Sequence, residues 1–200
     1  MKKRKKLSLN VLFEDNHIIA VNKQSGDIVQ GDKTGDETLG EKVALFFKNK
    51  YKLDTSKYSM FGHSAGGQFS HRYLMLSDNP KIDKAVIANP GWYTFLAGAR
   101  YPYGIKDIPV SISNEGIKNF LSMRNTLMLG SKDTGSSSLN TSPGAMKQGE
   151  DRLSRGNNYF ESLIKTTKEN DIPFRWNYHL VEGVDHDFRK MSDAAAKVLL

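Results

Sequence analysis

Cysteine is absent from the 200-residue sequence, and no apolar run in it approaches the length of a membrane span. The lack of cysteine excludes a disulfide scaffold, a thiolate metal site and a cysteine nucleophile. A transmembrane helix needs about 20 consecutive apolar residues, so none is predicted. The basic residues 2–6 resemble the start of a secretory signal, but Glu14 and Asp15 interrupt the apolar segment that would have to follow. These features predict a cytoplasmic protein without membrane contact.

The composition is that of a globular protein with a basic balance. Hydrophobic residues make up 38% and charged residues 26%, which argues against wholesale disorder. The formal net charge is +7, and five basic residues stand together near the start: Lys2, Lys3, Arg4, Lys5 and Lys6. A basic tail of this kind can contact RNA weakly through the phosphate backbone. It is more often a solvated terminus that keeps a protein soluble.

The first fifty residues predict a small β-and-helix segment. Short apolar runs at 11–13 and 18–21 flank a polar connection and predict a β-hairpin. Residues 24–38 are rich in Gly, Asp, Ser and Thr and predict a loop. Apolar residues recur at helical spacing from 39 to 51 and predict a helix there.

After residue 53 the sequence alternates between strand and helix patterns. The predicted strands cover residues 58–61, 84–88, 125–129 and 176–181. The predicted helices cover residues 68–76, 116–123, most of 144–170, and 192–200 with Ser192 as N-cap. Residues 91–115 show no regular pattern and are rich in aromatic side chains. Alternating strands and helices predict an α/β fold with a mainly parallel sheet and flanking helices.

A nucleophile motif follows the strand predicted at 58–61. Residues 62–66 read Gly-His-Ser-Ala-Gly and fit G-x-S-x-G, in which a sharp strand-to-helix turn lifts the serine clear of the sheet. The two glycines are needed because a Cβ at either position would collide with neighbouring backbone. The strand before the motif and the helix after it are the context that this turn requires. Ser64 is therefore a candidate nucleophile.

A serine nucleophile needs a base to accept its proton and an acid to orient that base. In folds with this turn, the chain order is serine, then aspartate or glutamate, then histidine. Asp133 follows the strand predicted at 125–129, 69 positions after Ser64, and His186 follows the last predicted strand, 53 positions further on. Both lie just past the carboxyl ends of strands, where open α/β sheets collect their sites.

Simpler interpretations exist for several of these residues. Aspartate is common in turns, so Asp133 could simply form the turn after its strand. His186 lies between two aspartates and could be a surface residue or a metal ligand. No partner at metal-ligand spacing accompanies His186, so neither a metal nor a cofactor is predicted. The turn is expected to direct the His63 side chain away from the site, and His71 suits packing or the surface. The aromatic residues of 92–103 suit either a substrate pocket or a cover for the sheet.

Five stretches between residues 53 and 200 share a family pattern: FGHSAGGQF at 61–69, ANPGWYTF at 88–95, LGSKDT at 129–134, QGEDRLSRGN at 148–157 and GVDHD at 183–187. Together they resemble a bacterial subgroup of α/β-hydrolase-fold proteins. The resemblance implies Ser64 as nucleophile, Asp133 as acid and His186 as base. It also implies that the Ala65 amide donates a hydrogen bond to the oxyanion, and that the substrate is a small ester-type molecule.

The segment before residue 52 resembles another family. VLFEDNHIIAVNK at 11–23 and GDIVQGD at 26–32 resemble the opening of the catalytic domain of RluA-like RNA pseudouridine synthases, over about residues 7–51. Gln24 stands where that family usually has proline. The family's catalytic aspartate lies in a His-Arg-Leu-Asp motif that this chain lacks, since His71-Arg72 continues as Tyr-Leu. The resemblance therefore supplies no catalytic residue.

The two resemblances predict a fusion near residue 52. Residues 1–52 would be the synthase-like segment, and residues 53–200 the C-terminal part of a hydrolase domain. The expected fold is thus a partial α/β-hydrolase fold preceded by a β-hairpin and a helix. The expected function is a serine hydrolase, slowed because the loop that usually gives the second oxyanion donor precedes this part of the fold. The alternative is a catalytically silent chimera, or a synthase-related fragment with weak RNA binding.

Overall fold

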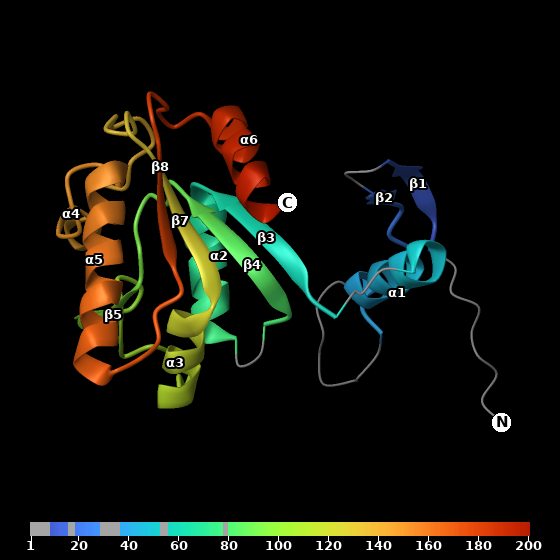
Figure 1. The fold of residues 1–200 in the computed structure, drawn as a ribbon, viewed down its shortest axis with the longest axis horizontal. Coiled ribbons are helices and arrows are strands. Elements are labelled where there is room, and N and C mark those ends of the chain that lie inside the picture. The colour runs from blue at the N-terminus through green and yellow to red at the C-terminus, as the bar shows by residue number, and fades with distance from the viewer. Residues whose placement is uncertain (1–8, 16–18, 29–36, 53–55, 78–79) are drawn as a thin grey trace. The chain divides into compact units, whose positions relative to one another are not determined.

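A computed structural model describes residues 9–15, 19–28, 37–52, 56–77 and 80–200. The chain divides into two compact units, Met1–Lys57 (unit 1) and Tyr58–Leu200 (unit 2) (Figure 1). Each unit is described by itself.

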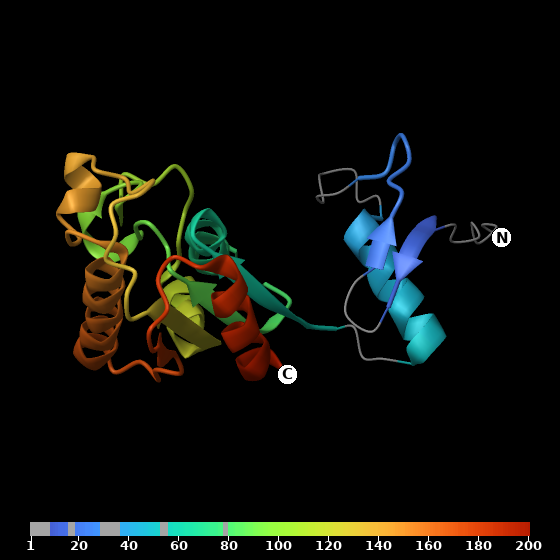
Figure 2. The same ribbon diagram turned by 90° about the horizontal axis from the view of Figure 1, so that it is seen from above.

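Unit 1 contains two short strands and one helix. Strands β1 (Val11–Glu14) and β2 (Ile19–Val21) pair antiparallel, which confirms the predicted hairpin strands, while residues 16–18 between them lie outside the described part. Helix α1 (Leu39–Tyr51) begins at a capping box and lies beside the strands (Figure 2), where Lys50 Nζ contacts Glu14 Oε2 at 2.7 Å. None of the residues described in this unit is fully buried, so polar contacts contribute much of its packing.

Unit 2 is built on a four-stranded parallel sheet. Its strands are β3 (Tyr58–His63), β4 (Ile82–Ala88), β7 (Arg124–Gly130) and β8 (Asn177–Val181), in the order β3-β4-β7-β8. The predicted α/β fold with a mainly parallel sheet is confirmed. Because all four strands run in one direction, their carboxyl ends meet at one edge of the sheet.

Helices cover both faces of this sheet (Figure 1). Alternating residues of β4 and β7 point to opposite sides, as the period of a strand requires. Ile87 and Leu127 pack into a core with α2 (Ala65–Leu76), α3 (Asn114–Ser122) and α5 (Arg152–Asn170). Val86 and Met128 pack on the other face against α6 (Phe188–Leu199). Across the described residues, no helix is both long and apolar enough to cross a membrane.

Two sequence-based expectations about these elements are wrong in detail. The stretch 91–115 is not wholly irregular, because β5 (Phe95–Arg100) and β6 (Gly104–Lys106) form a parallel ribbon. Helix α6 begins at Phe188 rather than at 192. The prediction that most of 144–170 is helical is confirmed, with a break between α4 (Pro143–Met146) and α5.

The start of α6 is determined by an aspartate. Asp187 is its N-cap, and its Oδ1 accepts from the amides of Arg189 and Lys190. Ser192, the predicted cap, lies inside the helix and donates to the carbonyl of Arg189.

His71 is a core residue whose two ring nitrogens are both used. Nδ1–H donates to the carbonyl of Gly67 at 3.0 Å, and Nε2 accepts from the amide of Thr94 at 3.0 Å. The ring is fully buried, and burial lowers the pKa of His71 from 6.5 to about 3, with the charge of Arg72 acting in the same direction. The neutral ring thus joins α2 to the segment after β4.

Acid is expected to destabilise unit 2 through His71. Its ring takes up a proton near pH 6.5 only in the unfolded chain, so the free energy of unfolding falls as the pH drops from 6.5 towards 3. Between pH 7.5 and pH 5.0 this one group contributes a loss of about 2 kcal/mol. Urea unfolding at both pH values should show a difference smaller by about that amount in His71→Gln than in the unchanged protein. An equal pH effect in both proteins would contradict the assignment.

Candidate active site

The turn between β3 and α2 holds Ser64 in a conformation that few residues adopt. Its φ is 55° and its ψ −117°, and its amide donates to the carbonyl of Ala88 at 2.9 Å. A Cβ at Gly62 would lie closer than 3.0 Å to Ser70 Oγ and to the carbonyl of Gly66. The turn can therefore form only with glycine at 62. The Ser64 hydroxyl does not cap α2, which leaves it free for another partner.

The structure brings the three predicted site residues together. His186 Nε2 lies 2.9 Å from Ser64 Oγ, and His186 Nδ1 lies 2.7 Å from Asp133 Oδ2. The geometry fits a ring in which Nδ1–H donates to the carboxylate and Nε2 accepts from the serine hydroxyl. Asp133 is buried, whereas the His186 side chain is 30% exposed. A half-buried serine thus stands at one end of the series of hydrogen bonds and a buried carboxylate at the other.

Arg152 is a neighbour of Asp133 that the sequence reasoning did not single out. Its Nη1 lies 3.4 Å from Asp133 Oδ1, and the two side chains are 3% and 1% exposed. Arg152 lies one turn before Gly156 and two turns before Tyr159, so the helical periodicity places it on the buried face of α5. Arginine is mostly a surface residue, so its residue type does not indicate burial.

Asn89 is a second residue that was missed. It follows β4 with φ 44°, and it is completely buried. Its Oδ1 accepts from the amide of Gly130, and its Nδ2 donates to the carbonyl of Asp185 at 3.3 Å. It therefore ties the end of β7 to the loop that carries His186. In the sequence it is noticeable only as part of the family-like stretch 88–95.

His63 does not point away from the site, contrary to the expectation. Its ring centroid lies 4.6 Å from that of His186 and 5.7 Å from that of Phe188. Its Nε2 is buried without a hydrogen-bond partner among the described residues. Burial, and then the neighbouring His186, lower the pKa of His63 to about 4. A neutral ring therefore packs against His186 near neutral pH.

Ala65 is the first residue of α2, directly after Ser64, and it is exposed. The first amides of a helix have no carbonyl partner within the helix, and the N-terminal end of the dipole attracts negative charge. The Ser64 amide itself is used by Ala88. The position of Ala65 suits the oxyanion donor that the family resemblance implies, and that role stays a prediction.

The alternative role of His186 as a metal ligand would require other ligand side chains nearby. No group of three or more His, Asp or Glu side chains suited to a metal ion occurs in the parts of the chain that the structure describes. Asp187 caps α6 and lies 3.5 Å from Lys190 Nζ.

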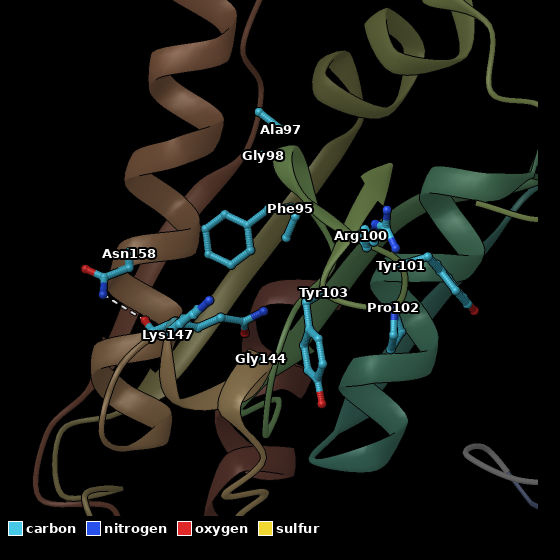
Figure 3. A pocket seen from close by; sticks show the side chains of 12 residues that line it. Phe95, Ala97, Gly98, Arg100, Tyr101, Pro102, Tyr103, Gly144, Lys147 and Asn158 are labelled. Atoms are coloured by element: carbon cyan, nitrogen blue, oxygen red, sulfur yellow. Dashed lines mark hydrogen bonds between the residues drawn. The ribbon is translucent and has the colours of Figure 1, made fainter. Parts of the chain in front are cut away.

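A cavity of about 590 Å³ lies between the β5–β6 ribbon and the segment from α4 to α5 (Figure 3). Phe95, Tyr101 and Tyr103 line it, together with Lys147, and Ser64, Asp133 and His186 are not among its lining residues. Tyr93, from the same aromatic stretch, is instead fully buried in the core. Within residues 92–103, some aromatic side chains thus line a cavity and Tyr93 packs in the core, while a role in substrate binding stays a prediction.

Comparisons with known proteins find likeness at the level of solved structures. No model of a known protein family matches the sequence, and no curated protein sequence matches it significantly. The chain is similar to LpqC, a poly(3-hydroxybutyrate) depolymerase from Bordetella parapertussis, with 30% identity and a TM-score of 0.70, over 78% of this chain and 53% of that one. It is also similar to poly(aspartic acid) hydrolase-1 from Sphingomonas sp. KT-1, with 33% identity and a TM-score of 0.71, over 84% of this chain and 67% of that one. The chain thus spans about half the length of the first and two thirds of the second.

Proposed function

Because the chain belongs to the α/β-hydrolase family, we propose that it is a serine hydrolase that cleaves an ester or a related acyl bond. The observation that carries this proposal is the hydrogen-bonded series Ser64–His186–Asp133, with distances of 2.9 and 2.7 Å. The names of both neighbours describe hydrolysis of a polymer whose units are joined by acyl bonds, which supports this substrate class.

The proposed reaction has two halves. Ser64 Oγ attacks the acyl carbon while His186 Nε2 takes the hydroxyl proton, and Asp133 holds Nδ1–H and stabilises the imidazolium. The Ala65 amide donates to the oxyanion of the tetrahedral intermediate. His186 then gives its proton to the leaving group, and an acyl-serine remains. Water, activated by the same histidine, hydrolyses the acyl-serine and restores Ser64.

We expect slow turnover. The fold usually takes a second oxyanion donor from a loop in its earlier strands, whereas the segment before β3 in this chain resembles another family. The loss of one such donor lowers turnover by about 10²–10³-fold. We also propose that residues 1–52 and 53–200 differ in origin, with the junction near residue 52.

The alternative functions gain less support. The comparisons give none to an RNA-modifying role for the synthase-like segment, and the basic residues 2–6 lie outside the described residues. A catalytically silent chimera would have no activated serine, whereas the proposed serine hydrolase has one at Ser64.

A fluorophosphonate probe tests for the activated serine directly. We expect the folded protein to be labelled at Ser64, because only a serine whose proton is accepted by a base reacts readily. Peptide mass spectrometry identifies the labelled residue. Heat-denatured protein and the His186→Ala variant serve as controls and should stay unlabelled. Labelling of both controls, or none of the folded protein, would argue for the silent chimera.

A further inference from the structure

The two carboxylate oxygens of Asp133 have different partners. Oδ2 accepts from His186, while Oδ1 faces the guanidinium of Arg152. Arg152 is the first residue of α5, and the amide of the next residue, Leu153, donates to the carbonyl of Asp133 at 3.3 Å. The N-terminus of α5 therefore holds Asp133 by both its side chain and its main chain.

Arg152 is itself fixed in place. Nη1 donates to the carbonyl of Gly135 at 3.3 Å and Nη2 to that of Ser137 at 2.7 Å. An arginine keeps its charge even when buried, and burial of a charge is costly unless hydrogen bonds or a counter-charge compensate for it. Asp133 is the carboxylate within ion-pair distance of Arg152 among the described residues. The Arg152–Asp133 pair therefore fixes the start of α5 to the loop after β7.

This pair affects the charge balance around His186. Asp133 stands between the other two side chains, with Oδ2 at His186 Nδ1 and Oδ1 at the Arg152 guanidinium, so the buried cation lies behind the carboxylate that the ring faces. A positive charge near an imidazole generally disfavours its protonated form. His63 contributes no charge near neutral pH, because its own pKa is lowered to about 4. Asp185 and Asp187 flank His186 on its own loop. The Asp187 carboxylate accepts hydrogen bonds from the first amides of α6 and forms an ion pair with Lys190. Arg152 is the buried cation of this group.

We propose that Arg152 is a positioning residue that holds Asp133 against His186, and that its charge extends the working range of His186 as a base towards lower pH. This inference rests on the proposed function. It adds a determinant of pH dependence that lies outside the Ser–His–Asp series.

The test compares the pH dependence of kcat/KM for an activated short-chain ester in three variants. Arg152→Gln removes the charge and leaves a shorter polar side chain, and Arg152→Lys keeps the charge. Arg155→Gln is the matched control, since Arg155 is a buried arginine one turn further along α5 that binds the carbonyls of Gly91 and Gly149 and no carboxylate.

We expect the acid limb of the profile to move up by about one pH unit in Arg152→Gln. In Arg152→Lys it should stay within about 0.3 units of the unchanged protein. Arg155→Gln should lower stability without moving the limb. An unmoved limb in Arg152→Gln, or an equal shift in Arg155→Gln, would overturn the proposal.

A second readout separates this inference from the proposed function. The His186 ring protons, followed by NMR titration, should show the same upward shift in Arg152→Gln whether or not the protein hydrolyses esters. A shift without any activity or probe labelling would leave the inference standing and contradict the proposed function. If Arg152→Gln fails to fold, Arg152→Met replaces it. If neither folds while Arg155→Gln does, Arg152 has a structural role only and the proposal fails.

Discussion

Replacing Ser64 by alanine is expected to lower ester hydrolysis by up to about six orders of magnitude, or to the rate without protein if that limit is reached first. The reason is that Ser64 Oγ is the atom that His186 Nε2 faces at 2.9 Å, and alanine leaves the base with nothing to activate. The measurement is the initial rate with an activated short-chain ester, for the unchanged protein and for Ser64→Ala prepared in parallel.

The accompanying variants separate a catalytic effect from a general loss of a side chain. His186→Ala should reduce the rate about as much as Ser64→Ala, and the double variant should be no slower than either, because the residues act as a unit. His179→Ala is the matched control, since His179 is an exposed histidine on β8. Equal rates in Ser64→Ala and the unchanged protein would mean that another residue is the nucleophile.

Substitution of Gly62 by alanine is expected to destabilise unit 2 by about 4 kcal/mol or more, enough to prevent folding of a marginally stable domain. The added Cβ would meet Ser70 Oγ and the carbonyl of Gly66 at once, and these two atoms are hydrogen-bonded to each other at 2.8 Å. Main-chain atoms on two sides of a sharp turn cannot move apart without opening it. Thermal unfolding, followed by circular dichroism, measures the effect.

The second glycine of the same motif provides the control. The expectation that both glycines of the motif are needed is wrong for Gly66, where a Cβ would meet nothing within 4 Å outside its own helix. Gly66→Ala should therefore be neutral or raise stability by up to about 1 kcal/mol. Gly62→Ala combined with Ser70→Ala should remain strongly destabilised, because the clash with the Gly66 carbonyl persists. A mild effect of Gly62→Ala alone would show that the turn can form without glycine at 62.

The elements that could be predicted from the sequence are those governed by local rules. Strand and helix periodicity identified the four strands of the parallel sheet, and the G-x-S-x-G pattern located the turn at Ser64. Asp133 and His186 were chosen from chain order and strand-end position, and the structure places both within hydrogen-bond reach in one series. These inferences needed no knowledge of side-chain packing.

The features that were missed depend on contacts between distant segments. Arg152 meets Asp133 across a long loop, and Asn89 meets the last residue of β7 and a residue of the loop after β8. The orientation of His63 follows from the exact course of a strained turn, which periodicity does not describe. The β5–β6 ribbon is short and irregular in register, so its sequence lacks a clear alternation.

The order of the strands has a consequence for synthesis of the chain on the ribosome. Each of β4, β7 and β8 pairs with the strand made just before it in the sheet, so unit 2 can grow in one direction as it emerges. Ser64 and His186 are separated by 122 residues, which takes about 6 to 24 s to translate at typical speeds. Ser64 is therefore made first, Asp133 next and His186 last. An emerging chain carries Ser64 without its hydrogen-bond partner His186 until the loop after β8 is made, so the hydrogen-bonded series can form only after all four strands of the sheet exist.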